Sequence, residues 1–394
     1  MAELRPLRAG ELEEAWELDR ECFHTPPERR EAFLALDPAR LVGAFEGVRL
    51  VGMVGVHALA QYFGGRAVPM GGVHTVAVAP HRRGEGLGRR LLAEALAGMR
   101  ERGEALSTLF PATTRLYRAQ GFELAGATVW RRIAPRDLDP LPRPAGARLR
   151  EVAPAEIPRL AACHAELAAA TNGFVAREPA FWETAGARHW PGRRIFAAED
   201  ARGRITGYAV YRALEGELGA IGGPFRIAVD EILWTERDAG LALWRLLGSW
   251  APQVETIFWR GTAEDPLLLL LRDQELGFVA EVRWMSRLVD AAAAVAARGF
   301  ADGLEAEAHL ELADAALPAN AGRWALRVAK GRGELVPGGR GDLRLDAGAL
   351  AALFTGWATP DRLARAGRLA GHGSSRSALA AAFAGPTPWM PEIF

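Results

Sequence analysis

Three glycines and two arginines are gathered between an apolar segment and an amphipathic one in residues 75–92. The apolar residues at its start predict a strand, and residues 87–99 predict a helix with apolar side chains on one face. Glycines let backbone amides come close to a ligand. Amides at a helix N-terminus favour an anion, and Arg82 and Arg83 add positive charge. This construction suits a pyrophosphate group.

Two common phosphate-binding motifs do not describe this segment. It lacks the Gly-Lys-Ser/Thr ending of a Walker loop. The dinucleotide fingerprint needs its three glycines directly after the first strand of the domain. Here the spacing is Arg83-x-x-Gly86-x-Gly88, and several other elements come before it.

Residues 76–88 resemble the acetyl-CoA signature of the GCN5-related N-acetyltransferases, the GNAT family. In that family the strand before the loop is bulged and splays from its neighbour, so that its backbone pairs with the pantetheine arm of the cofactor. The resemblance implies that backbone amides of residues 83–88 hold the pyrophosphate. It assigns to the acetyl-CoA site Val76, Ala77, Val78, Arg82, Arg83, Gly84, Gly86, Leu87 and Gly88.

Tyr117 is the first candidate catalytic residue. It stands four residues before Gly121-Phe122, as in the GNAT motif whose Tyr is the general acid for the CoA sulfur. A phenol with a pKa of about 10 is protonated at neutral pH and suits this role. The alternative is an aromatic side chain that only packs on its helix.

Phe394 is the second candidate, because the resemblance implies that the C-terminal carboxylate is the general base. A direct transfer needs no enzyme nucleophile, and neither cysteine has an activated context. Glu392 is a candidate for attracting a cationic amine. His57, His74 and His81 are rival bases, but each is better explained as structural or solvated. Trp16 is better explained as core, and Asp19 as a surface charge that could also hold a cation.

The elements that must position these residues follow a repeated order. The first third predicts a helix at 11–23, strands at 41–45, 50–59 and 70–79, a helix at 87–99, a strand at 106–111 and a helix at 114–119. Proline-rich residues 135–144 predict a linker. Afterwards a strand at 148–152, a helix at 157–170, strands at 194–200, 205–214 and 225–233, a helix at 239–250 and a strand at 255–259 repeat that order, which indicates an internal duplication.

Over its full length the chain resembles the Eis-like (enhanced intracellular survival) N-acetyltransferases. The resemblance implies an α/β (α+β) protein with two tandem GNAT-like domains, 1–139 and 140–289, and a sterol-carrier-like domain, 290–394, whose C-terminus reaches the active site. Residues 236–240 of the second unit have one glycine and two carboxylates where the loop should be. Carboxylates repel a pyrophosphate, so we expect no CoA there.

Composition excludes several classes of protein. The 48 basic and 48 acidic residues balance, which argues against a nucleic-acid or anionic-membrane binder. Two distant cysteines predict neither a disulfide framework nor a metal site. The N-terminus lacks a signal peptide, and no apolar run is long enough to span a membrane. We therefore expect a cytoplasmic protein, and the resemblance implies a homo-oligomer, a hexamer.

The sequence thus predicts an acetyl-CoA-dependent N-acetyltransferase that moves the acetyl group directly to a primary amine of a small molecule. The resemblance implies an aminoglycoside, polyamine or lysine-like acceptor. One alternative is an acetyltransferase for protein or peptide amines. The other is a non-catalytic CoA- or lipid-binding protein, against which the intact loop and Tyr117 argue.

Overall fold

The computed structural model describes residues 2–215, 224–273 and 276–394 and divides into two compact units. Unit 1 contains Met1–Ala125, Arg283–Gly385 and Ile393–Phe394. Unit 2 contains Gly126–Val282 and Pro386–Glu392. Each unit therefore collects segments that lie far apart in the sequence.

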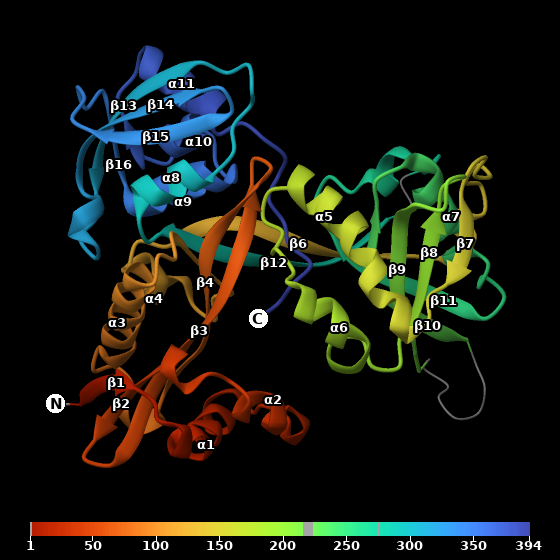
Figure 1. The fold of residues 1–394 in the computed structure, drawn as a ribbon, viewed down its shortest axis with the longest axis horizontal. Helices are drawn as coiled ribbons and strands as arrows, with labels where there is room; N and C mark the ends of the chain where they lie inside the picture. The colour runs from red at the N-terminus through yellow and green to blue at the C-terminus, as the bar shows by residue number, and fades with distance from the viewer. Residues whose placement is uncertain (1, 216–223, 274–275) are drawn as a thin grey trace. The chain divides into compact units, whose positions relative to one another are not determined.

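The first sheet of unit 1 carries the candidate site (Figure 1). Its strand order is β1-β2-β3-β4-β5-β12, with only β4 and β5 paired in parallel. The last position is taken by β12, whose residues 285–288 pair with β5. The strands are β1 (Glu3–Pro6), β2 (Leu41–Glu46), β3 (Arg49–Phe63), β4 (Arg66–Val78), β5 (Leu106–Leu109) and β12 (Gly277–Leu288).

Helices cover both faces of this sheet because successive side chains of a strand point to opposite faces. Val54 on β3 packs with Leu92 of α3 (Leu87–Glu101) in one cluster of buried side chains. Met53 packs with Trp16 of α1 (Leu12–Phe23) in another, which confirms Trp16 as core. The short helices of this part are α2 (Arg30–Leu34) and α4 (Thr114–Arg118).

The rest of unit 1 is a five-stranded sheet with four helices. Its strand order is β15-β14-β13-β16-β17. A buried ion pair between Arg287, at the end of β12, and Asp314 lies where this part joins the first sheet. The elements are α8 (Ala291–Ala297), β13 (Ala306–Ala313), β14 (Gly322–Ala329), β15 (Arg332–Pro337), β16 (Leu343–Asp346), α9 (Ala347–Thr355), α10 (Pro360–Arg365), β17 (Leu369–Ala370) and α11 (Ser374–Ala382).

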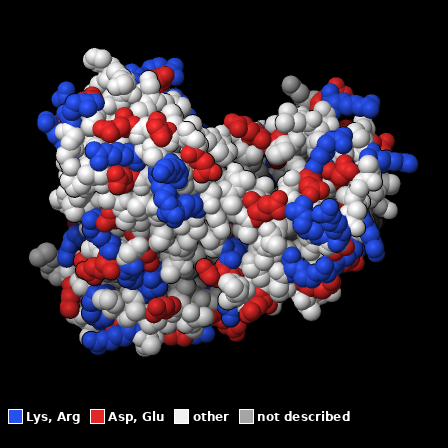
Figure 2. Space-filling model, turned by 45° about the horizontal axis from the view of Figure 1, so that its top comes forward, with Lys and Arg blue, Asp and Glu red and all other residues white. Residues whose placement is uncertain are grey.

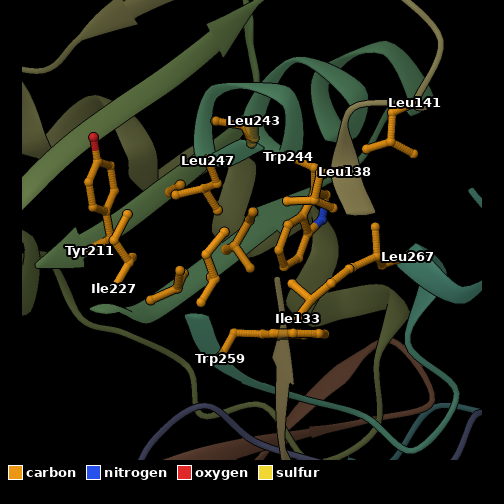
Figure 3. Close-up of a cluster of buried hydrophobic side chains, with 14 of the residues drawn as sticks. Ile133, Leu138, Leu141, Tyr211, Ile227, Leu243, Trp244, Leu247, Trp259 and Leu267 are labelled. Carbon is orange, nitrogen blue, oxygen red and sulfur yellow. The ribbon is translucent and has the colours of Figure 1, made fainter. Parts of the chain in front are cut away.

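Unit 2 repeats the topology of the first sheet, as an internal duplication predicts. Its order β7-β8-β9-β10-β11-β6 matches β1-β2-β3-β4-β5-β12, and β10 is again parallel to β11. Trp244, Trp259 and Leu247 belong to its main core (Figure 3). The elements are β6 (Glu123–Ile133), β7 (Arg148–Glu151), α5 (Ala161–Ala170), α6 (Pro179–Arg188), β8 (Arg194–Glu199), β9 (Ile205–Leu214), β10 (Phe225–Trp234), α7 (Arg237–Gly248) and β11 (Val254–Gly261).

The final strands of the two repeats are exchanged. β6 follows β5 and α4 in the chain, yet from residue 129 it pairs with β11 of unit 2. β12 follows β11, yet it completes the sheet of unit 1. The sequence pattern predicts no element for residues 123–133. Unit 2 begins at Gly126, before the proline-rich residues 135–144.

The surface matches the balanced composition. Figure 2 shows basic and acidic side chains intermingled on the face displayed. Within residues 2–215, 224–273 and 276–394, no helix is long and apolar enough to cross a membrane.

Candidate active site

The centre of the candidate site is the point where β4 parts from β5. In the described chain the two strands pair only over Met70–Gly72. The register of β4 with β3 shifts between His74 and Ala77, and Thr75 has a φ of 50°. Such a bulge bends the strand and increases its twist. The remainder of β4 therefore has an edge turned away from β3 that β5 does not cover.

The backbone of this edge faces the space between the strands. Ala79 N donates to Val51 O at 3.0 Å, so Ala79 and, by alternation, Ala77 direct their polar groups toward β3. Val76 and Val78 direct theirs to the other edge. The carbonyl of Val78 also accepts from Nε of Arg83 at 3.2 Å. The bulge and splay that the GNAT resemblance implies are thus present.

The glycine loop is open where a ligand must approach. Gly84 and Gly86 have φ values of 87° and 77°, which favour glycine, and a Cβ on Gly84 would meet no heavy atom within 4 Å. Gly86 caps α3 without any side-chain hydrogen bond, so the first amides of the helix point into the loop. Leu87 is buried and anchors the helix, whereas a Cβ on Gly88 would lie 3.7 Å from Val78.

The two arginines of the loop are not equivalent. Arg82 forms ion pairs with Glu46 at 2.6 Å and Glu85 at 2.7 Å, so two carboxylates offset its charge. Arg83 is exposed and no carboxylate is recorded as its ion-pair partner in the described chain. Arg83 is therefore the better source of positive charge for an incoming anion.

A cavity of about 250 Å³ in unit 1 brings the two candidate catalytic residues together. Tyr117 on α4 and Phe394 both line it, and Val76 of the predicted cofactor strand lines it as well. The ring of Phe394 stacks edge-on against Phe110 at 5.9 Å, and a Cβ on Gly72 would lie 2.9 Å from that ring. The remaining lining residues are Asp19, Phe23, Val73, His74, Thr75 and Ala112.

The Tyr117 hydroxyl stays protonated at neutral pH. The side chain is 6% exposed, and its ring packs edge-on against Phe122 at 6.1 Å. Burial raises the pKa of the phenol above its ordinary value of 10.0.

Two of the histidines that rival Phe394 as bases, His57 and His74, are poorly suited to the role because burial lowers the pKa of both. His74 and His57 stack at 4.0 Å, and His74 lines the cavity. Burial, helped by the charges of its neighbours, lowers the pKa of His74 to about 3. His74 is therefore neutral and only weakly basic.

Asp19 lines the cavity, although its place on a helix rich in charged residues predicts a surface charge. It lies on α1 but is 5% exposed, and its carboxylate accepts a hydrogen bond from Thr25. Burial raises its pKa. Its spacing of four and three residues from the buried Ala15 and Trp16 is the signal in the sequence that it shares their face of the helix.

The carboxylate of Glu392 is poorly placed to attract a cationic amine, because it forms an ion pair. In unit 2 it pairs with Arg177, whose Nε donates to the carboxylate at 2.8 Å. Arg177 also binds Glu231 with two hydrogen bonds. The carboxylate of Glu392 is thus already partnered.

The corresponding helix start in unit 2 is filled by protein groups. A Cβ on Gly240 would lie 2.7 Å from the ring of Trp234. The carboxylate of Asp238 accepts from the amides of Ala145 and Gly146 at 2.9 and 2.8 Å, and Glu236 pairs with Arg204. This arrangement supports the expectation that unit 2 holds no pyrophosphate.

Comparisons with known proteins agree with this geometry. Models of the acetyltransferase (GNAT) domain match residues 3–125 and 173–288, and a model of the sterol carrier protein domain matches residues 291–391. An uncharacterized N-acetyltransferase of Streptomyces griseus is 31% identical over 94% of this chain and 93% of its own. N-acetyltransferase Eis of Mycobacterium bovis is 30% identical over 88% and 86%. The crystal structure of a GCN5-related N-acetyltransferase from Anabaena variabilis superposes with a TM-score of 0.92 at 27% identity, covering all of both chains.

The fold and the site define a GNAT enzyme, with two GNAT domains followed by a sterol-carrier-like domain, and the predicted fold class is confirmed. The chain belongs to the Eis-like N-acetyltransferases. It is an acetyl-CoA-dependent acetyltransferase. In the described part of the chain, no group of three or more His, Cys, Asp or Glu residues is placed to hold a metal ion.

Replacing Gly86 by valine should weaken acetyl-CoA binding at least ~10-fold, since each charge-assisted hydrogen bond contributes about 1.5–3 kcal/mol. A β-branched side chain strains the left-handed backbone and occupies the open loop. Isothermal titration calorimetry measures the change. Gly103→Val is the matched control, because Gly103 has the same φ of 77° at the other end of α3. Equal affinities of the two variants would place the cofactor elsewhere.

Proposed function

We propose that this enzyme transfers the acetyl group directly from acetyl-CoA to a primary amine of a small cationic molecule: an aminoglycoside, a polyamine or a lysine-like amine. The observation that supports it is the cavity of unit 1, which is lined by Tyr117, Asp19 and the C-terminal Phe394. A proton donor, a buried carboxyl group and the last residue of the chain lie around one space. These are the groups that aminolysis of a thioester requires.

The residues beside the cavity fit acetyl-CoA, which supplies an acetyl group activated as a thioester. We propose that Val76 and Val78 pair with its pantetheine arm through their backbone, next to the contacts of Ala77 with β3. The residues of the loop that hold the pyrophosphate are Arg82, Arg83, Gly84, Gly86, Leu87 and Gly88. Open backbone at a helix N-terminus and the exposed Arg83 support this assignment.

Two residues of this chain handle the protons in the proposed mechanism. Tyr117 donates its phenolic proton to the sulfur of the leaving thiolate. The α-carboxylate of Phe394 accepts a proton from the ammonium group of the acceptor, directly or through water. The attacking nitrogen loses its second proton as the C–S bond breaks, and this proton restores the Tyr117 phenol. Neither residue forms a covalent bond with the acetyl group.

The charge around the cavity selects the acceptor. Asp19 and the α-carboxylate of Phe394 are the acidic groups of the lining residues, and no arginine or lysine is among those residues in the described chain. Phe23 and Phe110 supply apolar walls. A cationic amine with some apolar surface fits such a cavity better than an anionic or neutral one.

Turnover with a panel of amines tests the acceptor class. We expect aminoglycosides and polyamines to be acetylated faster than neutral aromatic amines, with release of CoA thiol as the measurement. Asp19→Asn should raise the KM for the cationic amines about 10-fold, the loss of one charge-assisted hydrogen bond. Glu17→Gln is the control, because Glu17 is exposed on the same helix. Acetylation of lysine peptides but of no small amine would contradict the proposal.

Tyr117→Phe should lower kcat by about 10²–10⁴-fold and leave the KM for acetyl-CoA nearly unchanged, because it removes only the proton donor. The ring that packs against Phe122 remains. Because burial raises the pKa of Tyr117, the wild-type kcat should show no alkaline decline due to this residue below pH 10. Steady-state kinetics across pH measure both effects. Tyr62→Phe serves as the control. A wild-type rate in Tyr117→Phe would show that Tyr117 is not the general acid.

Moving the terminal carboxylate should abolish turnover even when the phenyl ring stays. Adding one glycine after Phe394 shifts the charge by about 3.5 Å along the chain, and we expect kcat to fall about 10²-fold or more. Phe394→Leu keeps a terminal carboxylate at the same residue and should retain most of the activity. Full activity of the extended chain, measured with the same thiol assay, would exclude the carboxylate as the base.

A further inference from the structure

The chain segment that precedes the terminal residue is tied to unit 2 by a series of specific contacts. We call Pro386–Glu392 the strap. Trp389 N donates to Asn172 O at 3.0 Å, and its ring packs edge-on against Phe174 at 4.9 Å. Thr128 Oγ1 donates to Met390 O at 2.8 Å. The strap is therefore held by both its backbone and its side chains.

The last contact of the strap is an ion pair between Glu392 and Arg177. Nε of Arg177 donates to the carboxylate of Glu392 at 2.8 Å, while the other nitrogens of the guanidinium bind the two oxygens of Glu231. Tyr208 adds a hydrogen bond to Glu231. A guanidinium fork held in this way has a single orientation, so the position of its Nε is defined.

The surroundings of Arg177 keep the ion pair free of water. Its side chain is 5% exposed and that of Glu231 is 3% exposed. The guanidinium carbon also lies 4.5 Å and 5.3 Å from the ring centroids of Phe181 and Trp182. Charge pairs screened so little by solvent constrain geometry more tightly than exposed pairs do.

Glu231 and Glu392 both accept hydrogen bonds from the guanidinium of Arg177. The position of the Glu392 side chain therefore depends on Arg177. His164 is the other basic group near Glu392, with Nε2 3.9 Å from Oε1. Burial lowers the pKa of His164 to about 3, so this ring carries no charge at neutral pH. Oε2 of Glu392 is buried and has no hydrogen-bond partner among the described residues. The hold on the Glu392 side chain therefore comes from Arg177.

We infer that Arg177 is a positioning residue for the reaction: through Glu392 it sets where the C-terminal carboxylate stands. Phe394 follows Glu392 by two residues, which span at most about 7 Å of extended chain. An anchor so close to the terminus limits the space that the carboxylate can sample. This inference rests on the proposed role of the Phe394 carboxylate. Arg177 itself does not line the cavity that holds Phe394.

Glu392→Gln tests the inference, because the amide keeps the shape and loses the charge. We expect kcat to fall about 10- to 100-fold, as small displacements of a catalytic group do, with the KM for acetyl-CoA unchanged. Arg177→Lys, which keeps a charge but loses the fork, should act in the same direction. Glu199→Gln is the matched control, since Glu199 pairs with Arg150 elsewhere in unit 2.

A second measurement reports on the strap without any catalysis. Carboxypeptidase A removes an aromatic C-terminal residue only when the terminus is accessible, so mass spectrometry should show faster release of Phe394 from Glu392→Gln than from wild type or Glu199→Gln. Unchanged acetyl-CoA affinity, measured by calorimetry, verifies that the variants are folded. Wild-type kcat and wild-type release of Phe394 in Glu392→Gln would overturn the inference.

A chain that ends at Ile393 separates this inference from the proposed function. If that chain keeps full turnover, the Phe394 carboxylate is not the general base, and this part of the proposed mechanism is wrong. In that case faster Phe394 release from Glu392→Gln would still show that Arg177 holds the terminus. If the shortened chain is inactive while Glu392→Gln is fully active, the proposed base stands and the positioning role of Arg177 is wrong.

Discussion

The separation of β4 from β5 after Gly72 is the constraint on which the active site depends. A strand in a sheet interior pairs along both edges, and buried polar backbone groups without partners are costly. The bulge at Thr75 turns the end of β4 so that one edge loses its neighbour and gains access to a ligand. The same divergence opens the space lined by Tyr117, Asp19 and Phe394. One irregularity in one strand thus accounts for both the proposed cofactor edge and the proposed acceptor cavity.

The duplicated units use the same topology for different purposes. In each unit a helix connects the two parallel central strands, yet the start of α7 is occupied where the start of α3 is open. The indole of Trp234 lies against Gly240, and Asp238 satisfies two loop amides. Unit 2 instead binds the strap, so its role in the proposed mechanism is to hold the end of the chain. In the proposed mechanism, the groups that transfer protons belong to unit 1 and the groups that anchor the strap belong to unit 2.

The exchange of β6 and β12 gives each unit a strand from the other repeat. Each sheet therefore lacks its final strand until both repeats have been synthesised, so neither repeat can complete its sheet alone. The buried pair of Arg287 and Asp314 extends this dependence within unit 1, because Arg287 on β12 is matched by a residue of the sterol-carrier-like part. A buried charge left without its partner is strongly destabilising. The sterol-carrier-like domain therefore supports the first sheet of unit 1.

By itself the sequence determined the features that depend on neighbours along the chain. The strand, loop and helix around Gly84–Gly86–Gly88, the helix bearing Tyr117 and the repeated order of elements all follow from local spacing and the backbone freedom of glycine. Only the tertiary structure decided which strands pair, because β6 and β12 choose partners more than a hundred residues away and periodicity does not encode a partner. It also decided that Asp19 faces the cavity and that Glu392 binds Arg177. Burial and long-range charge pairing set those two positions. Helical spacing places Asp19 on the inward face of its helix but does not reveal the cavity, and neither residue type nor spacing gives the pair of Glu392 and Arg177.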